Sequence, residues 1–196
     1  MRTGNSIKSA IASSMAVKER LLRDIKFLER LEQAIIVLIE TFRSGKRVYL
    51  CGNGGSAADA QHIAAEFSGK FYLDRKALPA EALHTNTSFL TATANDYSYA
   101  DTFKRSIEAF GRDGDVLIGI STSGNSDNIV RAQKEARARG MTVISMTGKT
   151  GGKLQQSSDI LLNVPSSDTP RIQESHILLG HIMAECVERA LFGKNE

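Results

Sequence analysis

Four polar residues in two predicted helices have the types and spacing needed to move a proton. His62 and Glu66 are four apart in a predicted helix, so they lie on one face about one turn from each other. Gln173 and His181 are eight apart in the last predicted helix, which brings them to a similar side. A base such as Glu66 and an acid such as His181 each contribute roughly 10²–10⁴ in rate when well placed. Beside a sugar carbonyl, they would move a proton between C1 and C2 through an enediol and interconvert a ketose and an aldose.

The same four side chains carry donor atoms for a divalent metal. Zn²⁺ accepts histidine nitrogen and carboxylate oxygen, whereas the amide oxygen of Gln173 is an unusual ligand. The set therefore predicts a metal site whose role is structural or that of a Lewis acid. The competing interpretation is an ordinary surface pair of His62 and Glu66, which is the more common meaning of this spacing when it stands alone.

A serine-rich loop, Ser121-Thr-Ser-Gly-Asn-Ser126, follows a predicted buried strand and precedes a predicted helix. Its four hydroxyl groups and free backbone N–H groups gather at a helix N-terminus, where hydrogen bonds and the helix dipole favour an anion. No lysine follows in the pattern of a nucleotide P-loop. The alternative is that Ser123 or Asn125 caps the helix, but capping needs one such residue and not four. We therefore expect the loop to bind a phosphate ester.

A glycine-rich loop, Gly52-Asn-Gly-Gly-Ser56, lies between an earlier strand and its helix. Its glycines allow a tight turn and a close approach of the backbone to a ligand. The spacing Gly52-x-Gly54-x-x-Ala57 also matches a loose dinucleotide pattern, which requires an acid at the end of the second strand. Here the acid, Glu81, lies inside that strand. Two hydroxyl-bearing loops around one sugar phosphate are therefore the better interpretation.

The order of elements predicts how the two loops come together. After Gly45, β-prone runs alternate with helical segments, which predicts an α/β fold with a five-stranded parallel sheet flanked by helices. In such sheets, ligands bind at the carboxyl ends of the strands, where both loops begin. The expected strands are Arg47–Cys51, Pro79–Leu83, Asp115–Ile120, Thr142–Thr147 and Ile160–Val164. The expected helices after Gly45 are Ala57–Ser68, Thr87–Ala94, Tyr99–Phe110, 127–139 and Thr169–Leu191.

The chain reads as one domain over residues 1–196, of which residues 1–44 are a helical extension. Apolar residues at helical spacing form a stripe from Ile7 to Phe42. A single helix of that span would be roughly 55 Å long, more than a small domain can cover, so a break near Asp24–Phe27 is expected. We predict that part of the stripe packs on another subunit. The alternative is a helical hairpin that covers its own core.

Composition limits the other classes of function. The 196 residues and the 41% hydrophobic fraction fit a globular domain with a full core. The net charge of +3 is spread along the helices, and tryptophan is absent, so a nucleic-acid partner is not indicated. The sequence has no apolar run long enough to span a membrane and no signal-peptide core, and its two cysteines imply no disulfide framework. We therefore expect a cytoplasmic location and no membrane partner.

Five motifs are highly specific in combination. They are Cys51-Gly-Asn-Gly-Gly-Ser-Ala-Ala-Asp-Ala-Gln-His62, Ala94-Asn-Asp96, Gly114-Asp-Val-Leu-Ile-Gly-Ile-Ser-Thr-Ser-Gly-Asn-Ser126, Met146-Thr-Gly148, and Arg171-Ile-Gln-Glu-Ser-His176 with His181. With these motifs the chain resembles, over nearly its whole length, the sedoheptulose 7-phosphate isomerases (phosphoheptose isomerases) of the SIS (sugar isomerase) domain superfamily.

The resemblance implies conversion of sedoheptulose 7-phosphate to D-glycero-D-manno-heptose 7-phosphate, in bacterial heptose biosynthesis, by a homotetramer with active sites near subunit interfaces. It implies that Glu66 and His181 transfer the proton. The implied ligands of Zn²⁺, one ion per subunit, are His62, Glu66, Gln173 and His181. The implied substrate contacts are Asn53, Gly54, Gly55, Ser56, Glu66, Asn95, Asp96, Ser121, Thr122, Ser123, Ser126 and Gln173.

Two positions depart from the family pattern. Lys70 stands where many relatives carry arginine, so the charge is kept but the bidentate geometry is lost. Ala94 stands where many isomerases have glycine, and alanine there also resembles related SIS proteins that bind a replication initiator. A non-catalytic SIS tetramer that binds a replication initiator is therefore the alternative function. Those relatives typically lack the last-helix histidine, whereas this chain keeps His181.

Overall fold

The computed structural model describes residues 2–193, with side chains from residue 4 onward. The α-helices are α1 (Arg2–Arg23), α2 (Ile25–Arg43), α3 (Gly55–Ser68), α4 (Thr87–Asp96), α5 (Thr102–Phe110), α6 (Asp127–Ala138) and α7 (Thr169–Phe192). The strands are β1 (Val48–Gly52), β2 (Ala80–Ala82), β3 (Val116–Ser121), β4 (Thr142–Thr147) and β5 (Ile160–Asn163). Two short 3₁₀ helices are η1 (Tyr99–Asp101) and η2 (Gly152–Ser157).

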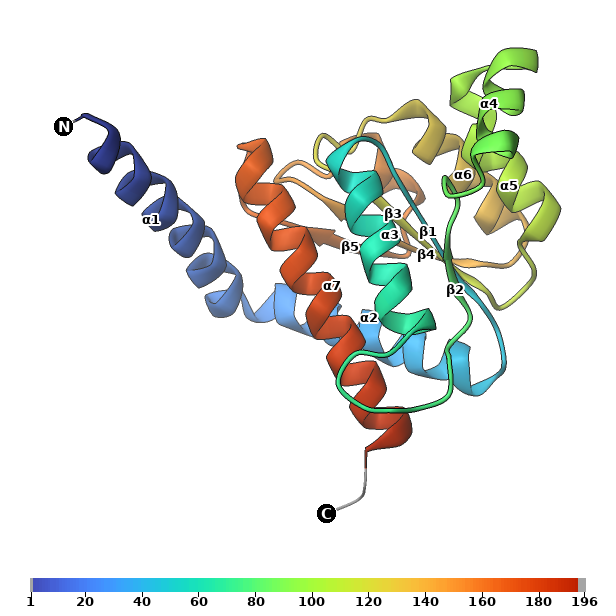
Figure 1. Cartoon of the computed structure of the whole chain (residues 1–196), viewed down its shortest axis with the longest axis horizontal. Helices are drawn as coiled ribbons and strands as arrows, with labels where there is room; N and C mark the ends of the chain where they lie inside the picture. The colour runs from blue at the N-terminus through green and yellow to red at the C-terminus, as the bar shows by residue number, and fades with distance from the viewer. Residues whose placement is uncertain (1, 194–196) are drawn as a thin grey trace.

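The five strands form one sheet in the order β2-β1-β3-β4-β5, and every neighbouring pair is parallel (Figure 1). This confirms the expected α/β fold with a five-stranded parallel sheet. Along β1, Val48 and Leu50 belong to the core on one face, whereas Tyr49 and Cys51 belong to the core on the other. Successive strand residues point to opposite faces, so a strand covered on both faces must be apolar throughout.

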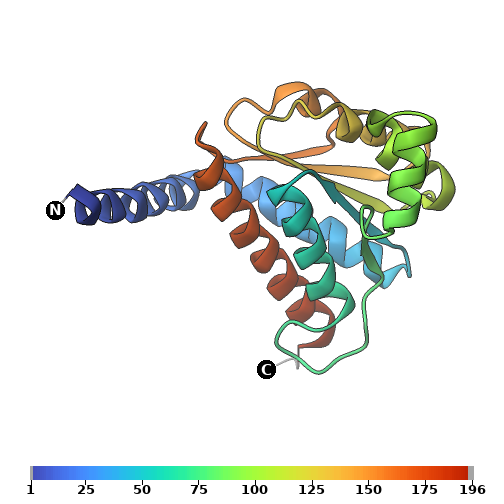
Figure 2. The same ribbon diagram turned by 45° about the horizontal axis from the view of Figure 1, so that its top comes forward.

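Helices cover both faces of the sheet. The apolar residues of α2, α3 and α7 pack on one face, and those of α5 and α6 pack on the other (Figures 1 and 2). The neighbours α3 and α7 are the two helices that carry the residues predicted to transfer a proton. The sheet therefore serves as a rigid platform, and this helix pair lies on one side of it.

The N-terminal segment divides into two helices at Asp24, as expected. Asp24 caps α2, because its carboxylate accepts a hydrogen bond of 3.0 Å from the backbone N–H of Phe27. Helix α2 packs on the core, whereas α1 projects from the body of the molecule (Figures 1 and 2). On α1, Ile7, Ile11 and Met15 are 57%, 58% and 65% exposed. The outer part of the predicted apolar stripe is therefore uncovered within one chain.

Most elements begin or end one to three residues from the expected position. Strand β2 has three residues, because the expected strand began at Pro79, which has no N–H to donate to a sheet. Helix α3 begins at Gly55, two residues before the expected start, so Gly55 and Ser56 belong to its first turn. None of the helices within residues 2–193 combines the length and the apolar character of a membrane span.

Candidate active site

Three ionisable side chains meet where α3 packs beside α7. The Nε2 atom of His62 lies 2.9 Å from Nε2 of His181 and 3.2 Å from Oε1 of Glu66. The side chain of His62 is 50% exposed and that of Glu66 is 22% exposed, so the cluster opens to solvent on one side. The predicted pair on α3 thus has a third partner from a helix more than a hundred residues later in the chain.

The donor set of this cluster fits a metal ion. One ligand atom from each of His62, Glu66 and His181 lies within 4.8 Å of the others. Two imidazole nitrogens at 2.9 Å must share a proton or face a common cation. Two histidines and one glutamate form a known catalytic zinc set, in which the fourth position is left to water or substrate. The cluster is therefore compatible with metal binding.

Close packing of α3 on α7 depends on two glycines. A Cβ atom on Gly180 would collide with the side chain of Ile63, which is fully buried on α3. A Cβ atom on Gly55 would collide with the amide of Gln173. Gln173 therefore lies against the first turn of α3, and its backbone is about 12 Å along the helix axis from that of His181. Its place among the metal ligands stays a prediction.

Asn53, in the loop after β1, is held by two other side chains. Its Oδ1 accepts hydrogen bonds from Nδ2 of Asn128 (2.9 Å) and from the hydroxyl of Tyr99 (2.8 Å). Its Nδ2 donates to Oδ1 of Asn128 at 3.0 Å. A side-chain amide has two acceptor sites and two donor hydrogens. These contacts use both acceptor sites and one N–H of Asn53, so its second N–H can donate to a ligand. The next residue, Gly54, has a φ of 54°, which favours glycine and turns the chain into α3.

The loop after β3 forms a cluster of hydroxyl groups. The Oγ atom of Ser121 lies 3.0 Å from that of Ser126 and 3.5 Å from that of Ser123. Ser126 occupies the N-cap of α6, but its side chain makes no capping hydrogen bond. Thr122 and Ser123 also line a cleft of about 300 Å³, which includes Lys149. Within the loop, Ser121 Oγ accepts the backbone N–H of Gly124 and Ser123 Oγ accepts that of Asn125, each at 3.2 Å. The hydroxyl groups thus face one another at a helix N-terminus, and the side chain of Ser126 does not cap α6, which favours the anion-binding interpretation.

Asn95 and Asp96 lie at the exposed end of α4. The Nδ2 atom of Asn95 donates to Oδ1 of Asp96 at 2.9 Å. Figure 1 places α4 apart from the pair α3 and α7. Tyr99 follows three residues later and reaches Asn53, so the segment joins the site at the loop after β1. The chain does not bring Asn95 and Asp96 into the cluster of His62, Glu66 and His181 found within the described residues.

Burial changes the pKa of two groups on these helices. Asp59 lies on α3 one turn before His62, and burial raises the pKa of its carboxyl to about 6, although nearby His62 lowers it. His176, on α7, is buried against β4, where its Nε2 lies 3.2 Å from the carbonyl of Thr147. Burial lowers the pKa of His176 to about 4, although the Thr147 carbonyl raises it. His176 therefore faces the sheet and is neutral near pH 7.

Sequence reasoning missed several residues that shape the site. Asn128 lies two residues beyond the serine-rich loop, and an amide at the start of that helix was a usable signal. Asp59 is three residues before His62 on the same helix face, and this spacing was also a usable signal in the sequence. No spacing could reveal Arg75 and Glu188, whose side chains form an ion pair of 2.9 Å across 113 residues and are 2% and 1% exposed.

Comparisons with known proteins identify the family of this chain. A family profile described as the SIS domain matches residues 14–148. The chain is 55% identical over 190 residues to a phosphoheptose isomerase of Clostridium acetobutylicum, covering 97% of each chain. It is 52% identical over 186 residues to one of Aneurinibacillus thermoaerophilus, covering 95% of this chain and 94% of the relative.

Solved structures lead to the same family. The phosphoheptose isomerase of Neisseria gonorrhoeae aligns with a TM-score of 0.89 at 43% identity, over 95% of this chain and 98% of the other. That of Francisella tularensis aligns with a TM-score of 0.92 at 34% identity, over 96% of this chain and the whole of the other. Both the sequence and the fold are shared over nearly full length. The chain therefore belongs to the SIS-domain family and, within it, to the phosphoheptose isomerases.

Proposed function

We propose that this protein is an isomerase that converts sedoheptulose 7-phosphate to D-glycero-D-manno-heptose 7-phosphate in bacterial heptose biosynthesis. One observation carries the proposal: a carboxylate, Glu66, and an imidazole, His181, arrive from two separate helices at one solvent-accessible cluster. A base and an acid so placed are the groups that a ketose–aldose conversion needs. The names of the relatives described above support the same chemistry.

In the proposed reaction, Glu66 removes a proton from C1 of the open-chain ketose. The electrons of the broken C–H bond form the C1–C2 double bond of an enediol, while His181 gives a proton to the C2 oxygen. His181 then takes the proton from the C1 oxygen, and Glu66 returns its proton to C2. The product is the aldose, and the enzyme ends in its starting protonation state. Each of the two groups supplies roughly 10²–10⁴ in rate.

Two loops hold the substrate in this proposal. The hydroxyl cluster of Ser121, Ser123 and Ser126, together with the neighbouring Thr122, takes the phosphate, since hydroxyl groups and a helix N-terminus both favour an anion. The second side-chain N–H of Asn53 donates a hydrogen bond to an oxygen of the sugar in this proposal. The other proposed substrate contacts are Gly54, Gly55, Ser56, Asn95, Asp96 and Gln173.

We further propose a Zn²⁺ ion, one per subunit, at His62, Glu66 and His181, with Gln173 as the fourth predicted ligand. Glu66 has a second carboxylate oxygen and His181 a second ring nitrogen, so each would bind the ion with one atom and exchange a proton with the other. A bound zinc ion would polarise the carbonyl of the open-chain sugar as a Lewis acid. His62 has no proton-transfer role in this scheme. Its imidazole lies between Glu66 and His181 and orients both side chains.

The whole chain is proposed to act as one domain, residues 1–196, within a homotetramer, with residues 1–44 serving in oligomerisation. The exposed apolar residues of α1 support this, because a partner subunit would remove them from water. Light scattering should give a particle of four 21.3 kDa chains. Ile11→Asp should reduce that mass, and a monomeric wild type would refute the assignment. The cytoplasmic location stays a prediction.

The deciding experiment is an assay of the purified protein with sedoheptulose 7-phosphate, with and without Zn²⁺, which follows the aldose product. Glu66→Gln and His181→Ala should each lower kcat at least about 100-fold. Glu185→Gln, on α7 but paired with Arg189, serves as the control and should keep full activity. Absence of product from wild type under both conditions refutes the enzyme proposal. Retained turnover in either folded variant refutes the proton-transfer roles.

The alternative, a non-catalytic tetramer that binds a replication initiator, gains no support from the relatives, which are named isomerases. It rests on Ala94 and on the helical extension of residues 1–44. Turnover together with a negative pull-down against the initiator protein would dismiss it.

A further inference from the structure

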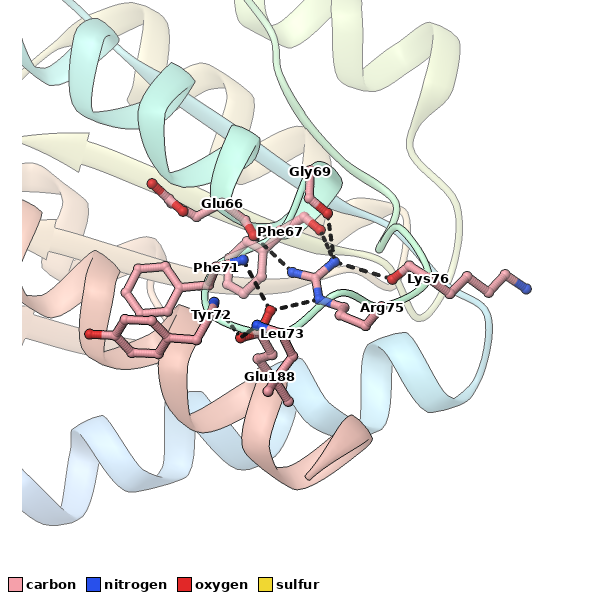
Figure 3. Close-up of polar contacts among 9 residues, drawn as sticks. All are labelled: Glu66, Phe67, Gly69, Phe71, Tyr72, Leu73, Arg75, Lys76 and Glu188. Atoms are coloured by element: carbon pink, nitrogen blue, oxygen red, sulfur yellow. Dashed lines mark hydrogen bonds and ion pairs between the residues drawn. The ribbon is translucent and has the colours of Figure 1, made fainter. Parts of the chain in front are cut away.

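We infer that Arg75 and Glu188 are positioning residues for Glu66 and His181. This inference rests on the proton-transfer roles proposed above. Glu188 lies on α7 seven residues after His181, two turns along the same face. Arg75 lies in the segment that leaves α3. Their buried ion pair therefore joins the end of one helix of the site to the side of the other (Figure 3).

The carboxylate of Glu188 organises the segment that follows α3. It accepts backbone N–H groups of Phe71 at 3.0 Å, Tyr72 at 2.6 Å and Leu73 at 2.9 Å, and Nε of Arg75 at 2.9 Å. Burial opposes ionisation, but these N–H donors and the guanidinium outweigh it and lower the pKa of Glu188. The charged carboxylate thus fixes three successive backbone positions (Figure 3).

The guanidinium of Arg75 organises the end of α3. It donates to the backbone carbonyls of Glu66 at 2.9 Å, Phe67 at 2.7 Å, Gly69 at 3.0 Å and Lys76 at 3.2 Å. The last carbonyls of a helix have no partner within the helix, so a buried end needs such donors. One of these carbonyls belongs to Glu66 itself, whose side chain lies in the cluster with His62 and His181.

The connection to His181 runs through Phe71. The ring centroid of Phe71 lies 5.8 Å from that of His181 and 4.5 Å from that of Tyr72. Because the N–H of Phe71 is bound to Glu188, its ring is held against the imidazole. One ion pair therefore acts on Glu66 through its backbone and on His181 through a packed ring.

The chemistry of the pair favours a positioning role over simple stabilisation. Burying two charges is costly, and well-packed apolar residues often serve stability equally well. A planar guanidinium with five donors, in contrast, can bind several carbonyls in a fixed geometry, which neither lysine nor an apolar residue can do. Arg75 uses its donors in that way on four carbonyls and one carboxylate.

The experiment compares Arg75→Lys, Glu188→Gln and Phe71→Leu in the full-length protein. Loss of a group that orients metal ligands costs about 10- to 100-fold in metal affinity or activity. We expect kcat to fall by that factor in Arg75→Lys and Glu188→Gln, with KM within about threefold of wild type. Zinc affinity of the stripped protein, measured by competition with a chelator, should weaken by a similar factor. Phe71→Leu should weaken both readouts in the same direction.

A variant that only destabilises the fold provides the control. Val143→Ala removes methyl groups in β4, on the sheet face opposite α3 and α7. It should lower the melting temperature and leave kcat and zinc affinity unchanged. If Arg75→Lys and Glu188→Gln instead behave like Val143→Ala, the positioning role is refuted. The kcat of Glu66→Gln is measured in parallel. If Glu66→Gln is inactive while the Arg75 and Glu188 variants keep wild-type kcat and zinc affinity, only this inference is refuted. If Glu66→Gln is active, the proposed function itself is refuted.

Discussion

Replacing Gly180 with alanine tests whether the site depends on the close approach of α3 and α7. Gly180 directly precedes His181, and a Cβ atom there would collide with the buried side chain of Ile63. Position 180 and Ile63 both lie buried in helix interiors, so neither the new methyl group nor the side chain of Ile63 can move into solvent. The added methyl group must therefore push the two helices apart or force Ile63 out of its rotamer.

Two opposing terms set the size of the effect on stability. Alanine in place of glycine favours a helix interior by about 1 kcal/mol. Overpacking a filled core costs about 1–3 kcal/mol. The free energy of unfolding should therefore fall by up to about 2 kcal/mol. The effect on turnover should be larger, because a displacement of about 1 Å at a reacting group can cost roughly 100-fold in rate.

Denaturant unfolding and steady-state kinetics with sedoheptulose 7-phosphate measure the two effects. The double variant Ile63→Ala/Gly180→Ala is the matched control, since it removes the atoms with which the new methyl group collides. Ile63→Ala alone should cost about 2–5 kcal/mol. In the double variant the losses should be less than additive by about 0.5–3 kcal/mol, the range for residues in contact. A Gly180→Ala protein with wild-type kcat would show that the helix spacing does not set the site.

Further predictions concern the substrate loops, the metal and pH. Asn128→Asp cannot donate to Oδ1 of Asn53, so we expect KM to rise about 3- to 10-fold, the value of one hydrogen bond, with a smaller change in kcat. Ser121→Ala should raise KM for sedoheptulose 7-phosphate about tenfold and leave the weak binding of unphosphorylated sedoheptulose unchanged, since only the ester carries the anion. Chelation of zinc should lower turnover, and its return should restore it; full activity in metal-free protein would contradict the proposed Lewis acid. The pKa of His176 is lowered from 6.5 to about 4, so its contribution to stability is complete above pH 6.5 and is lost as pH falls toward 4. The loss is up to roughly 3 kcal/mol and should disappear in His176→Gln, as urea titrations across this pH range can measure.

The sequence contained enough information for the fold and for part of the site. The alternation of β-prone runs with helical segments predicted the parallel sheet. The spacing of His62 and Glu66 predicted a shared helix face, and they do lie together. These predictions succeeded because each depends on residues that are close in the chain or on a regular repeat.

The remaining features depend on contacts between distant segments, for which the chain carries no local signal. Nothing near Arg75 indicates that its partner is Glu188, 113 residues later. The reciprocal amide pair of Asn53 and Asn128 likewise appears only when β1 and β3 lie side by side. The exposed apolar residues of α1 are compatible with the prediction that part of the stripe from Ile7 to Phe42 packs on another subunit, which stays a prediction.

The three contacts along the pair α3 and α7 explain why the site lies between helices and not only at the sheet edge. Gly55 meets Gln173, Ile63 meets Gly180, and the end of α3 meets Glu188 through Arg75. Both helices thus run in the same direction, and their register is fixed at the beginning, the middle and the end. A slip of one turn would move His181 by about 5.4 Å, out of reach of His62 and Glu66. Gly55 and Gly180 set the distance between the helices, and the buried ion pair sets their register. The proposed proton transfer therefore depends on Gly180, Arg75 and Glu188, none of which is a proposed substrate contact.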